Sequence, residues 1–226
     1  MSFYVGLDLG QAADFTALAV LEAVSAEEVE CELHLRHLKR YPLRTPYTAV
    51  AEDVVALVEQ LRDITVSRAE PDLLVDNTGV GRAVTDVLRD KDLRFKTITL
   101  TGGSQVTRGD TGEYRVPKAD VVDALVVAFQ AGTLKVAGGL QLWPTLRTEL
   151  LNFRRKINPA TAHASYEHWR ESEHDDLVLA AALAAWGAQC FSHTTPPDVR
   201  SLATISRSSY WSGAGGSSLG RRSWRV

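Results

Sequence analysis

The chain has 226 residues and a mass of 24.7 kDa, enough for one domain or for one domain with a tail. Its formal net charge of −3 argues against a protein that binds nucleic acid through bulk positive charge, and its 45% hydrophobic and 23% charged residues argue against wholesale disorder. Two cysteines far apart in sequence argue against a disulfide framework or a zinc site, and the most apolar run, 177–186, is too short to span a membrane.

Three strands are expected in the first forty residues. Residues 3–9 are apolar and rich in β-formers, residues 15–24 follow a polar turn, and residues 30–40 alternate apolar with polar side chains. Because the connections between them are short, the three strands should form an antiparallel meander.

The chain then alternates helices and strands. Apolar residues at helical spacing begin after Thr45, the expected N-cap, and Pro46, the expected first helical residue. A strand over 72–76, a helix over 80–90 and a strand over 94–100 follow. A meander followed by α-β-α-β predicts an α/β fold, with a mixed sheet flanked by helices.

The next segment, 101–116, is polar and rich in glycine, which indicates a long loop of the kind that often carries function. It precedes an amphipathic helix over 117–131, a short strand-like piece over 132–137 and a helix over 143–155. A final helix over 174–190 is rich in alanine, which suits close packing.

The C-terminal composition indicates a domain boundary. From residue 194 the sequence is rich in Ser, Gly and Arg and has no apolar period, which is typical of a flexible tail. We therefore expect one domain over 1–193 and a tail over 194–226. The alternation of polar and apolar residues over 164–170 predicts a further short strand.

Acidic residues lie at three comparable places in this pattern. Asp8 lies in the first strand, Asp76 ends the strand over 72–76, and Asp175 and Asp176 begin the last helix. A buried carboxylate is unfavourable unless it is compensated, and Mg²⁺ or Mn²⁺ is one such compensation. Each acid also has an ordinary alternative role: a turn acceptor for Asp8, an Asx turn for Asp76, and a helix cap for the last two.

The order of these elements resembles the ribonuclease H-like fold. Four segments resemble the nuclease domain of the large terminase of tailed bacteriophages, in this order along residues 3–190: VGLDLGQAADFTALAV, LLVDNTGVG, VPKADVVDALVVAFQAGTLKV and HDDLVLAAALA. The resemblance implies that Asp8, Asp76 and Asp176 are catalytic metal ligands, and that Asp175 is a further ligand.

The same resemblance implies a metal-dependent endonuclease that cleaves double-stranded viral DNA during genome packaging. Two Mg²⁺ or Mn²⁺ ions about 3.5–4 Å apart would clamp the scissile phosphate. The implied partners are the terminase ATPase domain, the small terminase subunit and the portal, in the cytoplasm of the infected bacterium. The sequence has no G-x-x-x-x-G-K-[ST] phosphate loop, so we expect the packaging ATPase to lie outside this chain.

Basic residues near the glycine-rich segment are candidates for DNA contact. Arg108, Arg115 and Lys118 flank this segment, and Arg154 and Arg155 form a second basic cluster at a helix end. Contacts to phosphates position DNA without reading its sequence, so we expect weak sequence preference. A solvated loop and a helix-dipole role are the alternatives for these two groups.

Three other functions remain open at this stage. A Holliday-junction resolvase would have the same fold and a similar acidic site. An actin-like or sugar-kinase-like ATPase also carries a D-L-G phosphate loop on an N-terminal hairpin, although it needs a second lobe. A binding module of the same fold without catalysis is the third, and the intact acidic residues argue against it.

Overall fold

The computed structural model describes residues 2–10, 14–24, 31–65, 68–79, 82–109, 111–156 and 174–191. The predicted strand over 164–170 and the predicted tail over 194–226 lie outside these residues. The described elements are, in chain order, β1 (Ser2–Asp8), β2 (Ala17–Val24), β3 (Glu32–Arg40), α1 (Tyr47–Ile64), β4 (Asp72–Asp76), α2 (Arg82–Asp90), β5 (Lys96–Thr101), β6 (Thr107–Arg108), β7 (Glu113–Pro117), α3 (Lys118–Gln130), β8 (Leu134–Val136), α4 (Trp143–Lys156) and α5 (Asp176–Cys190).

The described strands form one mixed sheet in the order β6-β7-β5-β4-β1-β2-β3-β8. Strands β1, β2 and β3 form the expected antiparallel meander. Strand β4 pairs in parallel with β1, β5 with β4, and β7 with β5, while β8 pairs in parallel with β3 at the opposite edge. The predicted meander followed by α-β-α-β is therefore confirmed.

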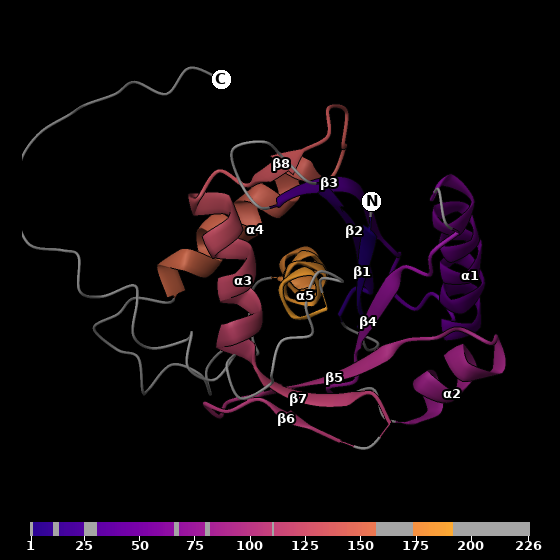
Figure 1. Cartoon of the computed structure of the whole chain (residues 1–226). Coiled ribbons are helices and arrows are strands. Elements are labelled where there is room, and N and C mark those ends of the chain that lie inside the picture. Colours follow the sequence, from indigo (N-terminus) through magenta and orange to yellow (C-terminus); the bar gives the residue numbers. More distant parts are fainter. Residues whose placement is uncertain are drawn as a thin grey trace, which may run out of the picture.

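Helices cover both faces of this sheet. Helices α1 and α2 pack on one face, against a core cluster that includes Val5 and Leu7 of β1. Helices α3, α4 and α5 lie on the other, and the sheet curves around α5 (Figure 1). Nearly every residue of α5 is buried, which explains its lack of a polar face. None of the helices in the described ranges is long and apolar enough to cross a membrane.

Glycine at position 6 allows α5 to lie directly on strand β1. A Cβ atom at Gly6 would lie 1.9 Å from the carbonyl oxygen of Ala180 and 2.9 Å from the amide nitrogen of Ala184. Both atoms belong to the backbone of α5 and cannot move aside as a flexible side chain would. Gly6 therefore fixes how closely the helix approaches the strand that carries Asp8.

Two local predictions were wrong. The segment 101–116 is not all loop, because it contains β6 and most of β7, which extend the sheet. Tyr114 and Val116 alternate toward the core and account for this strand. The N-cap of α1 is Pro46, not Thr45, whose hydroxyl instead donates to the carbonyl oxygen of Pro42.

Candidate active site

Two of the predicted acids lie side by side on one face of the sheet. Leu7 of β1 is paired in parallel with Val75 of β4, so the next residues along the two strands are Asp8 and Asp76. Residues in register on neighbouring strands share a face. This face carries α5, because Tyr4 and Leu74 of the same strands pack in the cluster around that helix.

Arg40 extends the same row across the sheet. Asp8 is opposite Ala17 of β2, and Ala17 is opposite Arg40 of β3. The row therefore runs Asp76, Asp8, Ala17, Arg40 over four neighbouring strands. Within this row, only the methyl group of Ala17 stands between the acids and the arginine.

A β-bulge brings Arg40 to this face. Val20 pairs with His37 and Leu21 pairs with Leu35, so the backbone pairing of β2 and β3 skips Arg36. The extra residue shifts the alternation of β3 by one, and Arg40 then shares a face with Leu35. Strict alternation from Leu35 would have placed Arg40 on the opposite face.

The third predicted acidic feature approaches from above the sheet. Asp176 is the first residue of α5 and is 5% exposed, compared with 9% for Asp8 and 5% for Asp76. Asp175 occupies the N-cap position without making a side-chain capping hydrogen bond, so its predicted capping role is wrong. The Nζ atom of Lys118, the first residue of α3, instead donates to the Oδ2 atom of Asp175 over 3.1 Å.

The charges of these acids act on one another. Burial raises the pKa of Asp8 well above its ordinary value, and the negative charges of Asp76, Asp176 and Asp175 raise it further, against the opposing charge of Lys118. These four carboxyl groups therefore lie near enough to repel one another. In the metal-free chain the cluster is electrostatically unfavourable.

Asp76 keeps one of its ordinary roles as well. Its Oδ1 atom accepts a hydrogen bond from the backbone N–H of Thr78 over 2.7 Å, which is the predicted Asx turn. Burial raises the pKa of Asp76, although the hydrogen bonds from Thr78 oppose the shift. The turn fixes the carboxylate at the end of β4.

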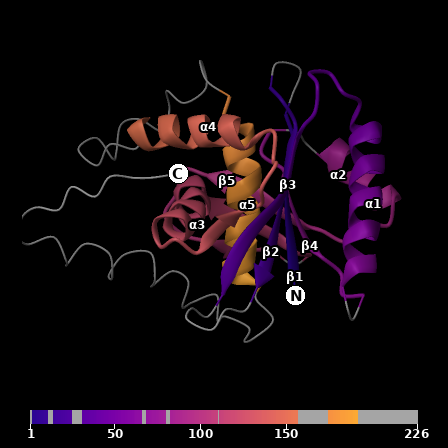
Figure 2. The same cartoon turned by 90° about the horizontal axis from the view of Figure 1, so that it is seen from above.

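Two further charged residues complete the site, and sequence reasoning missed both. Arg40 donates to the Oε1 atom of Glu149 on α4, and its terminal nitrogen lies 3.3 Å from the Oδ2 atom of Asp176. Burial raises the pKa of Asp176 to about 6, although the charge of Arg40 opposes the shift. Burial also raises the pKa of Glu149, whereas Arg40 and the backbone N–H groups of Val178 and Leu177 lower it. Helix α4 crosses near this end of α5 (Figure 2).

The chemistry of these side chains fits a hard divalent cation, although the side chains are not yet arranged as a coordination shell. Within the described ranges, no three His, Cys, Asp or Glu side chains are already grouped as metal ligands. Every candidate donor is a carboxylate oxygen, which Mg²⁺ and Mn²⁺ prefer. In addition, the Oδ2 atom of Asp176 is buried without a hydrogen-bond donor, as is the Oδ1 atom of Asn77 beside Asp76.

The candidate DNA contacts do not form one patch. Arg108 pairs with Tyr114, and its guanidinium lies 5.6 Å from the centre of that ring, whereas Arg115 pairs with Thr107 and so points to the other face of the strand. Both arginines are exposed. Lys118 faces the acids, as described above. Arg154 and Arg155 lie in the last turn of α4, and their side chains are outside the described part of the structure.

Comparison with known proteins gives structural matches only. No family model matches the sequence, and no curated protein matches it. The manganese-soaked, inhibitor-bound nuclease domain of the human cytomegalovirus terminase has a TM-score of 0.51 and 16% identity, covering 83% of each chain. The large terminase of a thermophilic bacteriophage has a TM-score of 0.50 and 12% identity over 83% of this chain, which spans 39% of that protein.

These likenesses establish the fold. The chain has the ribonuclease H-like fold of terminase nuclease domains, as the order of its elements predicted. The RuvC structure of Thermus thermophilus has a TM-score of only 0.34, at 14% identity over 82% of this chain. That value is too low to support the resolvase alternative, which stays a prediction, as does the ATPase alternative.

Proposed function

We propose that this chain is a metal-dependent endonuclease of the terminase type, which cleaves double-stranded DNA. The observation that carries the proposal is the row of Asp8 and Asp76 on one sheet face, with Asp176 at the buried helix end above it. Buried carboxylates that raise one another's pKa are unfavourable as mere structural groups, and such groups concentrate at functional sites. The fold that this chain shares with the cytomegalovirus terminase nuclease domain and with a phage large terminase supports the same function.

Asp8, Asp76 and Asp176 would hold Mg²⁺ or Mn²⁺, with Asp175 as a further ligand. When bound, a pair of such ions activates water and stabilises the leaving oxygen of a phosphodiester. The protein itself supplies rigid supports. Strand pairing fixes Asp8, the turn at Thr78 fixes Asp76, and α5 carries the other two acids. None of the carboxylates has to act as a nucleophile.

Lys118 would serve the acids and not the DNA backbone. Its ammonium group already donates to Asp175 and lowers the pKa of both Asp8 and Asp76 through its charge. Phosphate contacts are left to the exposed Arg108 and Arg115 near the β6–β7 edge. In a packaging machine, the ATPase domain, small subunit and portal would deliver DNA to this edge in the host cytoplasm.

The test is relaxation of a supercoiled plasmid in Mn²⁺ or Mg²⁺ by the wild-type chain and by Asp8→Asn. We expect the wild type to nick the plasmid and the variant to lose nicking while it still melts cooperatively. Asp72→Asn is the matched control, because Asp72 lies on the same sheet face but pairs with Lys96 at the far end of β4. Equal nicking by wild type and Asp8→Asn would overturn the proposal.

A further inference from the structure

The guanidinium of Arg40 lies between two buried carboxylates, and its contacts with them are unequal. Its terminal nitrogen donates a hydrogen bond to Glu149, whereas the same atom lies 3.3 Å from Asp176 without a hydrogen bond. The side chains of Glu149 and Asp176 are 8% and 7% exposed. Arg40 is therefore shared between a residue outside the acidic row and one of the proposed metal ligands.

Glu149 lies beside the first turn of α5. The N-cap residue Asp175 leaves the first turn of this helix without a side-chain cap. The backbone N–H groups of Leu177 and Val178 in that turn favour the ionised form of Glu149. The helix dipole favours a negative charge at this end of α5, although the Oε2 atom of Glu149 has no hydrogen-bond partner there.

The position of Arg40 is limited by its neighbours. The ring of Phe15 lies beneath the guanidinium, with 5.1 Å from its centre to the Cζ atom. Arg40 is the last residue of β3 and is anchored by backbone pairing to Ala17. If Glu149 lost its charge, Asp176 would be the carboxylate left within reach, and a bidentate arginine pair would occupy the oxygens that a metal needs.

We propose that Glu149 is a positioning residue that holds Arg40 away from Asp176 and so leaves Asp176 available to a divalent cation. This inference rests on the proposed metal-dependent nuclease. It gives Glu149 no contact with DNA or with the reacting phosphate. Its effect on the reaction passes through Arg40 and the charge that Asp176 can offer.

The test is Mn²⁺ binding by the whole chain, followed by the electron paramagnetic resonance signal of free Mn²⁺. Glu149→Gln should weaken binding by about tenfold or more, in the range seen when partners of metal ligands are replaced. The double variant Arg40→Met/Glu149→Gln should return to within about threefold of the wild type, because the competing cation is gone. A double variant as weak as Glu149→Gln would overturn the inference.

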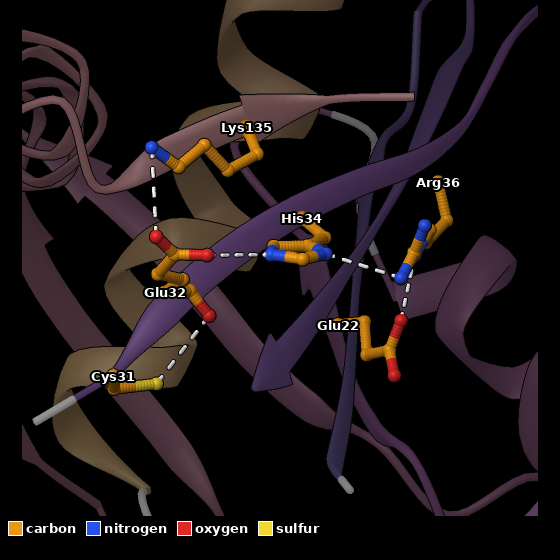
Figure 3. A network of polar contacts seen from close by, with 6 residues as sticks. All are labelled: Glu22, Cys31, Glu32, His34, Arg36 and Lys135. Carbon is orange, nitrogen blue, oxygen red and sulfur yellow. Dashed lines mark hydrogen bonds and ion pairs between the residues drawn. The ribbon is translucent and has the colours of Figure 1, made fainter. Parts of the chain in front are cut away.

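The matched control is Glu22→Gln. Glu22 of β2 accepts a hydrogen bond of 2.6 Å from Arg36 of β3, the strand that also carries Arg40 (Figure 3). The side chain of Glu22 is 5% exposed. Glu22→Gln therefore breaks a comparable Arg–Glu pair outside the acidic row, and it should leave Mn²⁺ binding unchanged. If Glu22→Gln and Glu149→Gln weaken binding equally, Glu149 has only a structural role and the inference is wrong.

Two outcomes separate this inference from the proposed function. If the wild type binds Mn²⁺ and nicks DNA but Glu149→Gln binds as the wild type does, only the inference fails. If the wild type neither binds Mn²⁺ nor nicks DNA, both fail. Should Glu149→Gln not melt cooperatively, Glu149→Asp replaces it, because the shorter acid keeps the charge but draws back from Arg40. Binding weaker than that of the wild type supports the inference, and unchanged binding overturns it.

Discussion

Asp176→Asn should make the metal-free chain more stable at pH 7 than the wild type. Burial raises the pKa of Asp176 to about 6, which is about 2 units above the value of about 3.9 expected in the unfolded chain. At about 1.4 kcal/mol per unit, ionised Asp176 destabilises the folded state by up to about 3 kcal/mol at pH 7. Asparagine has the same shape and stays neutral, so it removes this penalty.

The sign of the pH dependence follows from the same difference. Because the folded pKa is the higher one, the folded chain binds more protons than the unfolded chain between about pH 4 and pH 6, and stability falls as pH rises through this window. Scanning calorimetry in EDTA should show Asp176→Asn melting up to about 10 °C above the wild type at pH 7, at about 2–4 °C per kcal/mol. The gap should shrink when the pH is lowered to 5.

The control for this prediction is Asp72→Asn, which removes a carboxylate that is paired with Lys96. This variant should be no more stable than the wild type, because its charge is compensated. If Asp176→Asn melts at or below the wild type at pH 7 in EDTA, the folded chain accommodates the ionised Asp176 well. The idea of an unfavourable acidic cluster would then have to be given up.

Two other variants test the fold and the DNA contacts. Gly6→Ala should lower the free energy of unfolding by about 1–3 kcal/mol, because its Cβ would clash with the carbonyl oxygen of Ala180. Gly102→Ala is the control and should change the free energy of unfolding little, because nothing lies within 4 Å of the added atom. Equal melting temperatures of the two variants would refute the close packing at Gly6. Arg108→Ala and Arg115→Ala should each reduce the salt dependence of DNA binding by about one unit of slope, and an unchanged slope in a filter-binding titration would remove these residues from the DNA interface.

The sequence was sufficient to predict the central part of the fold. Strands β1 and β4 are nearly continuous apolar runs because both of their faces are covered by helices, so that an Asp at the end of each run stands out. The Ala-rich composition of α5 likewise predicts a helix that is enclosed by other elements. Periodicity therefore located the elements that carry Asp8, Asp76 and Asp176.

Short strands at the sheet edge could not be predicted in the same way. Strand β7 has only two alternating core residues, Tyr114 and Val116, within a polar segment. In the sequence, such a short alternation cannot be distinguished from a loop. It forms a strand because it pairs with β5. The distribution of Arg108 and Arg115 on two faces follows from this pairing, so it was equally inaccessible.

Arg40 and Glu149 depend on tertiary packing even more directly. The alternation of β3 predicts Arg40 on the face away from α5, and only the bulge at Arg36 reverses this. The one available signal is that Leu38 follows Leu35 after three residues instead of two. Glu149 has no comparable signal, because a single Glu on an amphipathic helix is usually solvated, and its burial depends on how α4 crosses α5.

The missing predictions share a physical cause. Periodicity arguments assume that each element minimises its own free energy, with apolar residues inward and charges outward. Here a missing helix cap and a group of buried acids depart from that rule at the N-terminal end of α5, and the bulge in β3 turns Arg40 to the sheet face on which they lie. Departures that are locally unfavourable and spatially clustered are expected where a fold has been shaped for binding and not only for stability. The same clustering is therefore an argument for function that does not depend on any structural relative.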